Sequence, residues 1–244
     1  MPAWIRKETI GRATVYLGCS LEIMPEAVAG RDHIVVTDPP YSSGGYNESG
    51  KAPGSIGTTG NVKIAGDTMT TEGYIALIRR TLRASSALAC YVLTDWKMWG
   101  HSREAIEHAG FRMRGMLVWN KGWAAMGTRW KSQHELIAWG TKLTSKPGDG
   151  RGNVIDCGRS GNEWHPTEKP LALMREIIGN AEPGAILDPF MGSGSTGVAA
   201  IQCGRDFVGI ELDPTHFETA CDRLRKAQTD GPMFEKPEQS GFNI

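Results

Sequence analysis

Short apolar runs alternate with helix-like segments along this chain, and that alternation restricts the folds it can adopt. Seven runs have the length and the residue types of buried strands, and they cover about residues 13–17, 33–37, 87–93, 114–119, 133–139, 185–188 and 206–210. Segments with helical periodicity separate most of these runs. Strands that alternate with helices predict a mostly parallel sheet whose two faces are both covered by helices.

One pair of strands departs from this alternation. Residues 120–132 (NKGWAAMGTRWKS) lie between two predicted strands and have the composition of a loop, so no helix fits there. Parallel neighbours need a long crossover connection, whereas antiparallel neighbours do not. The sequence therefore predicts an α/β fold with a seven-stranded, mostly parallel sheet that contains one antiparallel strand and has helices on both faces.

Charge and cysteine content limit the classes of function. The chain has 27 basic and 27 acidic residues, so its formal net charge is zero. Any binding of nucleic acid would therefore depend on a local basic patch. The five cysteines form no C-x-x-C pair and no metal-ligand spacing, which predicts free thiols and no metal site. The N-terminus lacks the apolar stretch of a signal peptide, and no run approaches the roughly 20 apolar residues that span a bilayer. We therefore expect a cytoplasmic protein that does not contact membranes.

The strand predicted at residues 33–37 ends abruptly in the sequence Asp38-Pro39-Pro40-Tyr41. Both prolines have φ fixed at about −65° and lack an N–H group, and the residue before each proline is held extended. This strand end therefore presents only hydrogen-bond acceptors, the Asp38 carboxylate and a backbone carbonyl such as that of Pro39, beside the aromatic face of Tyr41. Such a site suits a planar ring that carries an amino group. The alternative is a proline turn whose aspartate caps a neighbouring segment.

A second motif lies near the end of the chain. Asp188 ends a predicted strand, and the turn Gly192-Ser193-Gly194-Ser195-Thr196 then opens a helix. Glycines in such a turn allow close backbone approach, and the start of the helix offers unpaired N–H groups to a ligand. About twenty residues further on, Glu211 ends the next strand, where a carboxylate is placed to bind the hydroxyls of a ribose. No lysine follows the glycines, so a nucleotide P-loop is not expected.

Together the two motifs, DPPY at residues 38–41 and DPFMGSGST at residues 188–196, resemble those of the S-adenosylmethionine-dependent DNA amino-methyltransferases. Their order, with the catalytic motif first and the cofactor motif last, is similar to that of the circularly permuted β group of this family. The resemblance covers roughly residues 13–226 and extends to His165–Pro170, which looks like the group's cofactor motif upstream of the glycines, and to Gln133–Glu135. It implies a Rossmann-like fold and S-adenosylmethionine as cofactor.

The resemblance also implies roles for individual residues. The implied catalytic set is Asp38, Pro39, Pro40 and Tyr41. The implied cofactor-binding set is Asp188, Phe190, Gly192, Ser193, Gly194, Ser195, Thr196, Glu211, Thr167, Lys169 and Cys19. Within it Glu211 would bind the ribose, and Thr167 and Lys169 are candidates for the methionine carboxylate; the alternative for Lys169 is an ordinary charge before a helix. Cys19 follows the first predicted strand, where many β-group members carry aspartate, so adenine contacts at that position stay open.

The implied reaction is methyl transfer to adenine N6 in DNA. The lone pair of this amino group is delocalised into the ring, and hydrogen bonds from its N–H groups to Asp38 and the Pro39 carbonyl would localise it for in-line attack. The target atom lies inside the duplex, so the base must be flipped out. Cytosine C5 methylation would need a Pro-Cys nucleophile, which the chain lacks. Cytosine N4 methylation stays open, although family members with that specificity more often have serine at the first motif position.

Two further classes of function stay open at this stage. The same acceptors could hold an amide or amine of RNA or protein, and the fold could also serve as a non-catalytic binding module. The presence of Asp38, Tyr41 and the glycines Gly192 and Gly194 argues against the binding module.

Double-stranded DNA is the expected partner, and residues 112–159 are the candidate contact region. They carry nine basic residues against three acidic ones, with tryptophans interleaved, which suits phosphates and flipped bases. The alternative is a solvated face with core tryptophans. The candidate DNA ligands are Lys121, Arg129, Lys131 and Trp123. A single methyltransferase domain over residues 1–244 would include a glycine-rich loop at 42–66 and a short target-recognition segment at 143–162, and it could form a homodimer.

Overall fold

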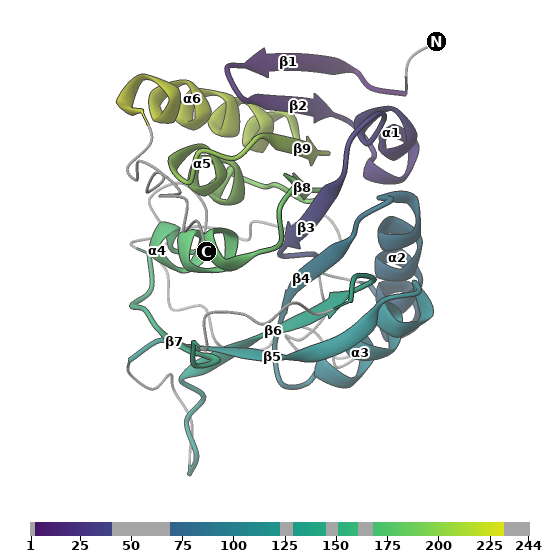
Figure 1. The fold of residues 1–244 in the computed structure, drawn as a ribbon, viewed down its shortest axis with the longest axis vertical. Coiled ribbons are helices and arrows are strands. Elements are labelled where there is room, and N and C mark those ends of the chain that lie inside the picture. Colours follow the sequence, from purple (N-terminus) through teal and green to yellow (C-terminus); the bar gives the residue numbers. More distant parts are fainter. Residues whose placement is uncertain (1–2, 41–68, 123–128, 145–150, 161–167, 232–244) are drawn as a thin grey trace, which may run out of the picture.

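The computed structural model describes residues 3–40, 69–122, 129–144, 151–160 and 168–231 of the chain (Figure 1). Among these residues nine strands form one sheet in the order β1-β2-β9-β8-β3-β4-β6-β5-β7. The strands are β1 (Arg6–Ile10), β2 (Ala13–Leu17), β3 (His33–Thr37), β4 (Ala89–Thr94), β5 (Arg112–Asn120), β6 (His134–Thr141), β7 (Val154–Asp156), β8 (Ala185–Asp188) and β9 (Phe207–Glu211). The helices are α1 (Ser20–Ala27), α2 (Thr71–Ala84), α3 (Trp99–His108), α4 (Leu171–Asn180), α5 (Ser195–Gln202) and α6 (Pro214–Asp230).

The centre of the sheet is parallel, with one reversed strand inside it. Strands β2, β9, β8, β3 and β4 run parallel, and β6 runs antiparallel to both of its neighbours, β4 and β5. The predicted helix-free pair is therefore antiparallel, and the prediction of an α/β fold is confirmed. Because β6 is reversed, its amino-terminal end lies beside the carboxyl ends of the parallel strands. One edge of the sheet thus gathers the residues that follow β3, β4, β5, β8 and β9 and those that begin β6.

The predicted strand number was wrong, since the sheet has nine strands rather than seven and two of them, β1 and β6, are antiparallel to their neighbours. The sequence of β1, RKETI, has a single apolar residue, and only Ile10 is buried. Its charged side chains also discourage the edge from pairing with another chain. At the opposite edge β7 is three residues long and pairs parallel with β5. Edge strands such as these need little apolar surface, so a search for apolar runs does not find them.

Two hydrophobic cores lie on opposite faces of the sheet. Ile34 and Val36 of β3 belong to the core that contains residues of α4, α5 and α6, whereas Val35 belongs to the core of α1, α2 and α3. Figure 1 shows these two layers of helices on opposite sides of the sheet. Since successive side chains of a strand point to opposite faces, a strand buried on both faces reads as a continuous apolar run. This explains why β3, β4 and β8 could be recognised in the sequence.

Local signals start two helices at the carboxyl edge of the sheet. The carboxylate of Asp213 accepts hydrogen bonds from the N–H groups of Thr215 (2.8 Å) and His216 (3.1 Å), and Pro214 occupies the first turn of α6. α5 begins directly after Gly194, which has a left-handed backbone conformation with φ of +84°. Both helices therefore point their N-termini, which carry a partial positive charge, toward this edge.

Candidate active site

The two sequence motifs meet at the carboxyl edge of the sheet. β3 and β8 are adjacent parallel strands, with Val35 opposite Leu187. The hydroxyl of Thr37 donates a 2.7 Å hydrogen bond to Oδ1 of Asp188, so the last residues of the two strands are in contact. From β3 the chain continues to β4 on one side, and from β8 it continues to β9 on the other. Such a reversal of strand order marks the position where open α/β sheets bind their ligands.

Asp188 links three elements of the site. Its carboxylate accepts hydrogen bonds from the hydroxyls of Thr37 on β3 (2.7 Å) and Thr196 on α5 (2.6 Å) and from the N–H group of Phe190 (3.1 Å). The residue is only 2% exposed, and burial raises the pKa of its carboxyl to about 6 against the opposing effect of these three donors. Both carboxylate oxygens are thus used within the protein. This arrangement holds β3, β8 and the start of α5 together.

The raised pKa of Asp188 predicts a specific dependence of stability on pH. Between about pH 4, where an unfolded aspartate releases its proton, and pH 6 the native state holds a proton that the unfolded state has lost. The contribution of Asp188 to the free energy of unfolding should therefore fall as the pH rises through this window, by at most about 3 kcal/mol. Replacing Asp188 with asparagine should remove that part of the slope in urea unfolding measured from pH 4.5 to 7. The exposed Asp230→Asn serves as control, and equal slopes in both variants would contradict the prediction.

The glycine turn between β8 and α5 is fixed by Glu211. The N–H group of Gly192 donates to Oε2 of Glu211 (2.8 Å), while Oε1 accepts from the N–H groups of Leu212 (2.9 Å) and Asp213 (2.8 Å). A carboxylate oxygen has two lone-pair sites, so Oε2 can still accept from a ligand hydroxyl. Glu211 therefore lies beside the glycine turn and holds its backbone, a structural role that the sequence did not reveal.

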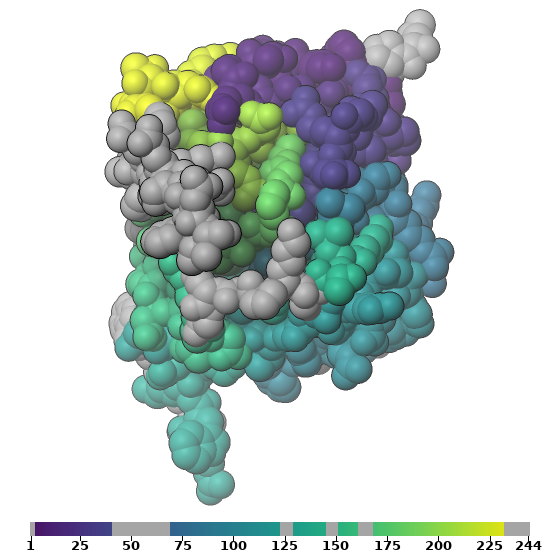
Figure 2. Space-filling model, viewed as in Figure 1, coloured from purple at the N-terminus to yellow at the C-terminus, as the bar shows by residue number. Residues whose placement is uncertain are grey.

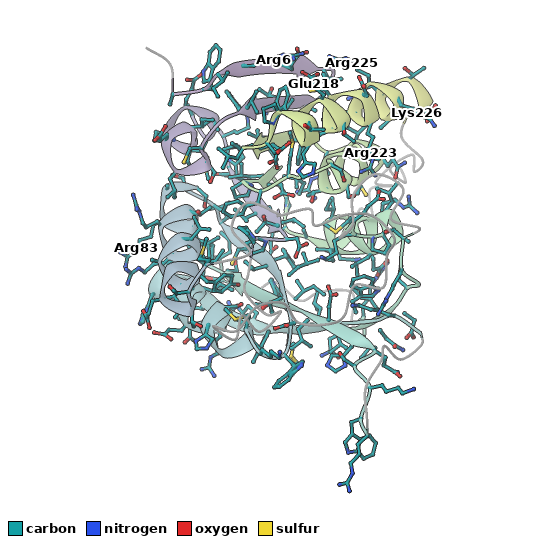
Figure 3. All side chains as sticks on the ribbon, turned by 180° about the vertical axis from the view of Figure 1, so that it is seen from behind. Arg6, Arg83, Glu218, Arg223, Arg225 and Lys226 are labelled. Atoms are coloured by element: carbon teal, nitrogen blue, oxygen red, sulfur yellow. The ribbon has the colours of Figure 1, made fainter. Side chains whose placement is uncertain are left out.

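Arg223 on α6 also holds the glycine turn, and sequence analysis missed it (Figure 3). Its guanidinium donates to the carbonyl oxygen of Ser193 (2.8 Å), to the hydroxyls of Ser193 (3.0 Å) and Ser195 (3.4 Å), and to Oε1 of Glu168 (2.7 Å). The side chains of Arg223 and Glu168 are almost fully buried. Arg223 thus joins the turn to α6 and to the segment that precedes α4. No local motif marks it, although an arginine between the buried Ala220 and Leu224 of an amphipathic helix is a weak signal.

The catalytic motif of the sequence lies next to a row of alternating charges. Oδ2 of Asp38 pairs with Nζ of Lys169, which lies 3.7 Å from Oε2 of Glu135, and Oε1 of Glu135 pairs with Nζ of Lys121. Oδ1 of Asp38 is shielded from solvent and has no hydrogen-bond partner among the described residues. Burial raises the pKa of the Asp38 carboxyl, and the ammonium of Lys169 opposes this rise. The site therefore contains an acceptor atom that is ready to receive a donor.

The remaining predicted residues fall in three places. Pro39 is buried and Pro40 is partly buried beside Asp38. Cys19, a partly buried free thiol, directly follows Gly18, whose N–H group donates to the carbonyl oxygen of Glu211 (2.8 Å), so it lies near the ribose candidate. Arg129 and Lys131 are exposed in the connection between β5 and β6. The residues and segments that lie outside the described part of the chain are Tyr41, Trp123, Thr167, the loop 42–66 and parts of the segment 143–162.

Two searches of the described residues bear on other classes of function. No group of three or more histidine, cysteine, aspartate or glutamate side chains in the described ranges is arranged to hold a metal ion. Nor does any helix within these ranges have the length and apolarity needed to cross a membrane.

Solved structures share this fold. M1.HpyAVI, in a complex with SAM, superimposes with a TM-score of 0.63 at 22% sequence identity, covering 87% of this chain and 99% of that chain. The PvuII DNA methyltransferase (cytosine-N4-specific) superimposes with a TM-score of 0.67 at 16% identity, covering 93% and 94% of the two chains. TTHA0409 from Thermus thermophilus, complexed with S-adenosyl-L-methionine, gives a TM-score of 0.61 at 20% identity over 87% of this chain and 95% of that chain. At such identities the likeness concerns the fold alone.

Sequence comparisons extend the likeness to the family. A family model described as DNA methylase matches residues 150–222. The type II methyltransferase M2.LlaDCHI of Lactococcus lactis subsp. cremoris is 28% identical over 239 residues, which cover 86% of this chain and 87% of that protein. The protein named "Putative methylase YubD" in Escherichia coli (strain K12) is 32% identical over 204 residues, which cover 80% of this chain and 82% of the relative. The resemblance inferred from the two motifs is thereby confirmed, and the chain belongs to the N6/N4 family of DNA methylases.

Proposed function

We propose that this chain transfers a methyl group from S-adenosylmethionine to the N6 amino group of adenine in double-stranded DNA. The observation that supports this most directly is Oδ1 of Asp38, which is shielded from solvent and has no hydrogen-bond partner among the described residues. An unpaired buried acceptor is costly, so its position suits a ligand that brings a donor. The exocyclic amino group of a base is such a donor.

The residues at the ends of β8 and β9 fit S-adenosylmethionine, the methyl donor of this family. Gly192 leaves open space at the turn before α5, since an added Cβ there would have nothing within 4 Å, and Oε2 of Glu211 retains a lone pair for a ribose hydroxyl. The first N–H groups of α5 have no partner within the helix, so they are available to a ligand. When bound, the cofactor supplies a methyl group activated by the positive charge of its sulfur atom.

The residues of the chain then act by orientation. Asp38 Oδ1 accepts one N–H group of the target amino group, and the carbonyl oxygen of Pro39 accepts the other. These two hydrogen bonds favour a tetrahedral nitrogen with a localised lone pair. Because Pro39 and Pro40 fix the backbone, the acceptors keep their places without reorganisation during the reaction.

Adenine is preferred over cytosine on the basis of Asp38. An N4-specific enzyme such as the PvuII methyltransferase shares the fold, and an amino group on cytosine would meet the same acceptors. The aspartate at the first position of the DPPY motif favours adenine through the family resemblance. The two bases are distinguished by digesting the product DNA to nucleosides and identifying the methylated one by mass spectrometry.

Transfer of a labelled methyl group tests the whole proposal. Incubation with labelled S-adenosylmethionine and DNA should label the DNA, and N6-methyl-2′-deoxyadenosine should be the labelled nucleoside. Parallel reactions with RNA and with protein substrates test the two other substrate classes. Label in RNA or protein but not in DNA would overturn the proposal. N4-methylcytosine in the DNA would confirm methylation of an amino group in DNA but exclude adenine as the target base.

The connection between β5 and β6 is our candidate for contacts to the DNA backbone. Arg129 and Lys131 are exposed, and Trp130 between them is 96% exposed. Figure 2 shows a teal projection of this connection standing out from the body of the molecule. The connection leaves β5 and enters β6 at the edge of the sheet where Asp38 lies, so it can reach DNA whose base is bound there. Lys121 differs, because its pairing with Glu135 and its limited exposure favour a role within the site.

Neutralising this projection should weaken DNA binding and reduce its dependence on salt. Each phosphate contact contributes about 0.9 to the slope of log affinity against log salt, so replacing Arg129 and Lys131 with alanine should lower the slope by about 2. The measurement is fluorescence anisotropy of a labelled duplex at several salt concentrations. Lys226→Ala removes an exposed charge from α6 and should leave the slope unchanged. An unchanged slope in the double variant would remove these two residues from the interface.

A further inference from the structure

A row of four charged side chains crosses the carboxyl edge of the sheet. Asp38 follows β3, Glu135 lies in β6, Lys121 follows β5, and Lys169 precedes α4. Their ion pairs run from Asp38 to Lys169, from Lys169 to Glu135 and from Glu135 to Lys121, and all four side chains are between 10% and 25% exposed. In ion pairs this shielded from solvent, removing one side chain leaves the charge of its partner without compensation, which destabilises the folded protein.

Lys169 is placed between two carboxylates. Its ammonium pairs with Oδ2 of Asp38 and lies 3.7 Å from Oε2 of Glu135. Burial alone would lower the pKa of Lys169, but the two carboxylates outweigh burial and raise it. Lys169 therefore remains charged and is already neutralised by protein groups. A methionine carboxylate, the ligand expected from the sequence, would be a third anion competing for the same ammonium.

The pairing also defines which atom of Asp38 is available. Lys169 engages Oδ2, and Oδ1 is left without a hydrogen-bond partner among the described residues. A carboxylate held at one oxygen cannot rotate freely, so the other oxygen keeps a fixed direction. Glu135 in turn has its Oε1 held by Lys121, which itself lies 4.9 Å from the centre of the Trp119 ring. The contact between Lys169 and Glu135 is looser, because Oε2 of Glu135 lies 3.7 Å from the ammonium and has no hydrogen-bond partner among the described residues, so Glu135 acts on Lys169 through its charge.

We propose that Lys169 and Glu135 are positioning residues for methyl transfer, with Lys169 orienting the Asp38 carboxylate toward the target amino group and Glu135 holding Lys169. This inference rests on the proposed function and adds residues to the same site. Glu135 acts through Lys169 and does not touch the reacting atoms. Lys121 balances its charge, so the four side chains have no net charge.

The surroundings of Asp38 explain why its carboxylate needs a cation beside it. Among the described residues, Lys169 and Lys121 favour the ionised form of Asp38, Glu135 and Asp188 oppose it, and Tyr74 lies close enough to interact. Burial also opposes ionisation. A protonated Asp38 would be a much weaker acceptor for an amino group. Removal of Lys169, the cation paired with Asp38, should therefore raise the pKa of the Asp38 carboxyl further.

Lys169→Met tests this assignment. We expect kcat at pH 7 to fall roughly tenfold or more, because the carboxylate loses its orientation, and the acidic limb of the pH profile of kcat to move to higher pH. The Kd of S-adenosylmethionine, measured by isothermal titration calorimetry, should change by less than about threefold. Lys169→Arg keeps the charge and should restore the acidic limb. The control, Lys226→Met, removes an exposed lysine of α6 and should change none of these quantities.

The opposite pattern would overturn the inference. If Lys169→Met raised the Kd of the cofactor more than about tenfold and left the acidic limb in place, Lys169 would be a ligand of the cofactor carboxylate. A second measurement does not depend on activity. In urea unfolding, the effects of Lys169→Met and Glu135→Gln should be strongly non-additive in the double variant, because the residues act as one unit. Additive effects would show that they do not. If the wild-type protein methylates no DNA, the proposed function fails, and this stability cycle still tests the row.

Discussion

Replacing Asp38 with asparagine is expected to lower kcat for DNA methylation by roughly 100- to 1,000-fold, the loss typical of removing one preorganised polar group from a transition state. Asparagine has nearly the same shape, so the turn at Pro39 and Pro40 should persist. Its amide oxygen is a weaker acceptor than a carboxylate, and its NH2 group would face the target amino group in the other orientation. The Kd of S-adenosylmethionine should stay within about threefold of the wild-type value, because Asp38 acts on the base.

A matched control for this variant lies at the end of the neighbouring strand. Asp95 follows β4, and its Oδ1 accepts hydrogen bonds from the N–H groups of Lys97 (3.0 Å) and Met98 (2.9 Å). Asp95→Asn can keep both hydrogen bonds and removes the same charge from the same edge of the sheet. It should retain most of the activity. If both variants lost activity equally, the loss would reflect the charge of the edge, and if Asp38→Asn kept a tenth or more of the activity, Asp38 would not be the acceptor.

The parts of the site that could be predicted share one physical origin. Asp38, Asp188 and Glu211 each follow or close a strand whose apolar run is visible in the sequence, because these strands are buried on both faces. The carboxyl ends of adjacent parallel strands must meet at one edge, so a motif at the end of each strand predicts a shared site. The hydrogen bond between Thr37 and Asp188 agrees with that reasoning.

The parts that could not be predicted depend on contacts between distant segments. Asp38 and Lys169 are separated by 131 positions, and their pairing depends on the path of the segment before α4 across the sheet edge. The sequence places a lysine there but gives no indication of its partner. Arg223 likewise contacts Ser193 only because α6 packs against α5. The edge strand β1 escaped prediction for another reason, since its backbone pairing tolerates charged side chains.

Gly194→Ala should destabilise the protein through both backbone strain and crowding. The φ of Gly194 is +84°, and an added Cβ would lie 3.0 Å from Cβ and 3.2 Å from Cα of Ala220 on α6. The left-handed conformation costs an alanine about 1–2 kcal/mol, and crowding against a helix backbone adds about 1–3 kcal/mol. We expect the free energy of unfolding in urea to fall by about 2–5 kcal/mol in total. Cofactor affinity should fall as well, because α5 cannot keep its place against α6.

Two other glycines separate these contributions. Gly30 has the same φ of +84° with nothing within 4 Å of an added Cβ, so Gly30→Ala measures the backbone cost alone. Gly192 has a φ of +52° and equally open surroundings, but it lies in the turn proposed to bind the cofactor. Gly192→Ala should therefore resemble Gly30→Ala in stability and differ from it in the Kd of S-adenosylmethionine. Equal stability losses at Gly30 and Gly194 would show that α6 yields to the added methyl group. If the Kd of S-adenosylmethionine were unchanged in Gly192→Ala, the cofactor would not bind at this turn. The proposed placement of its methyl group beside Asp38 would then fail as well.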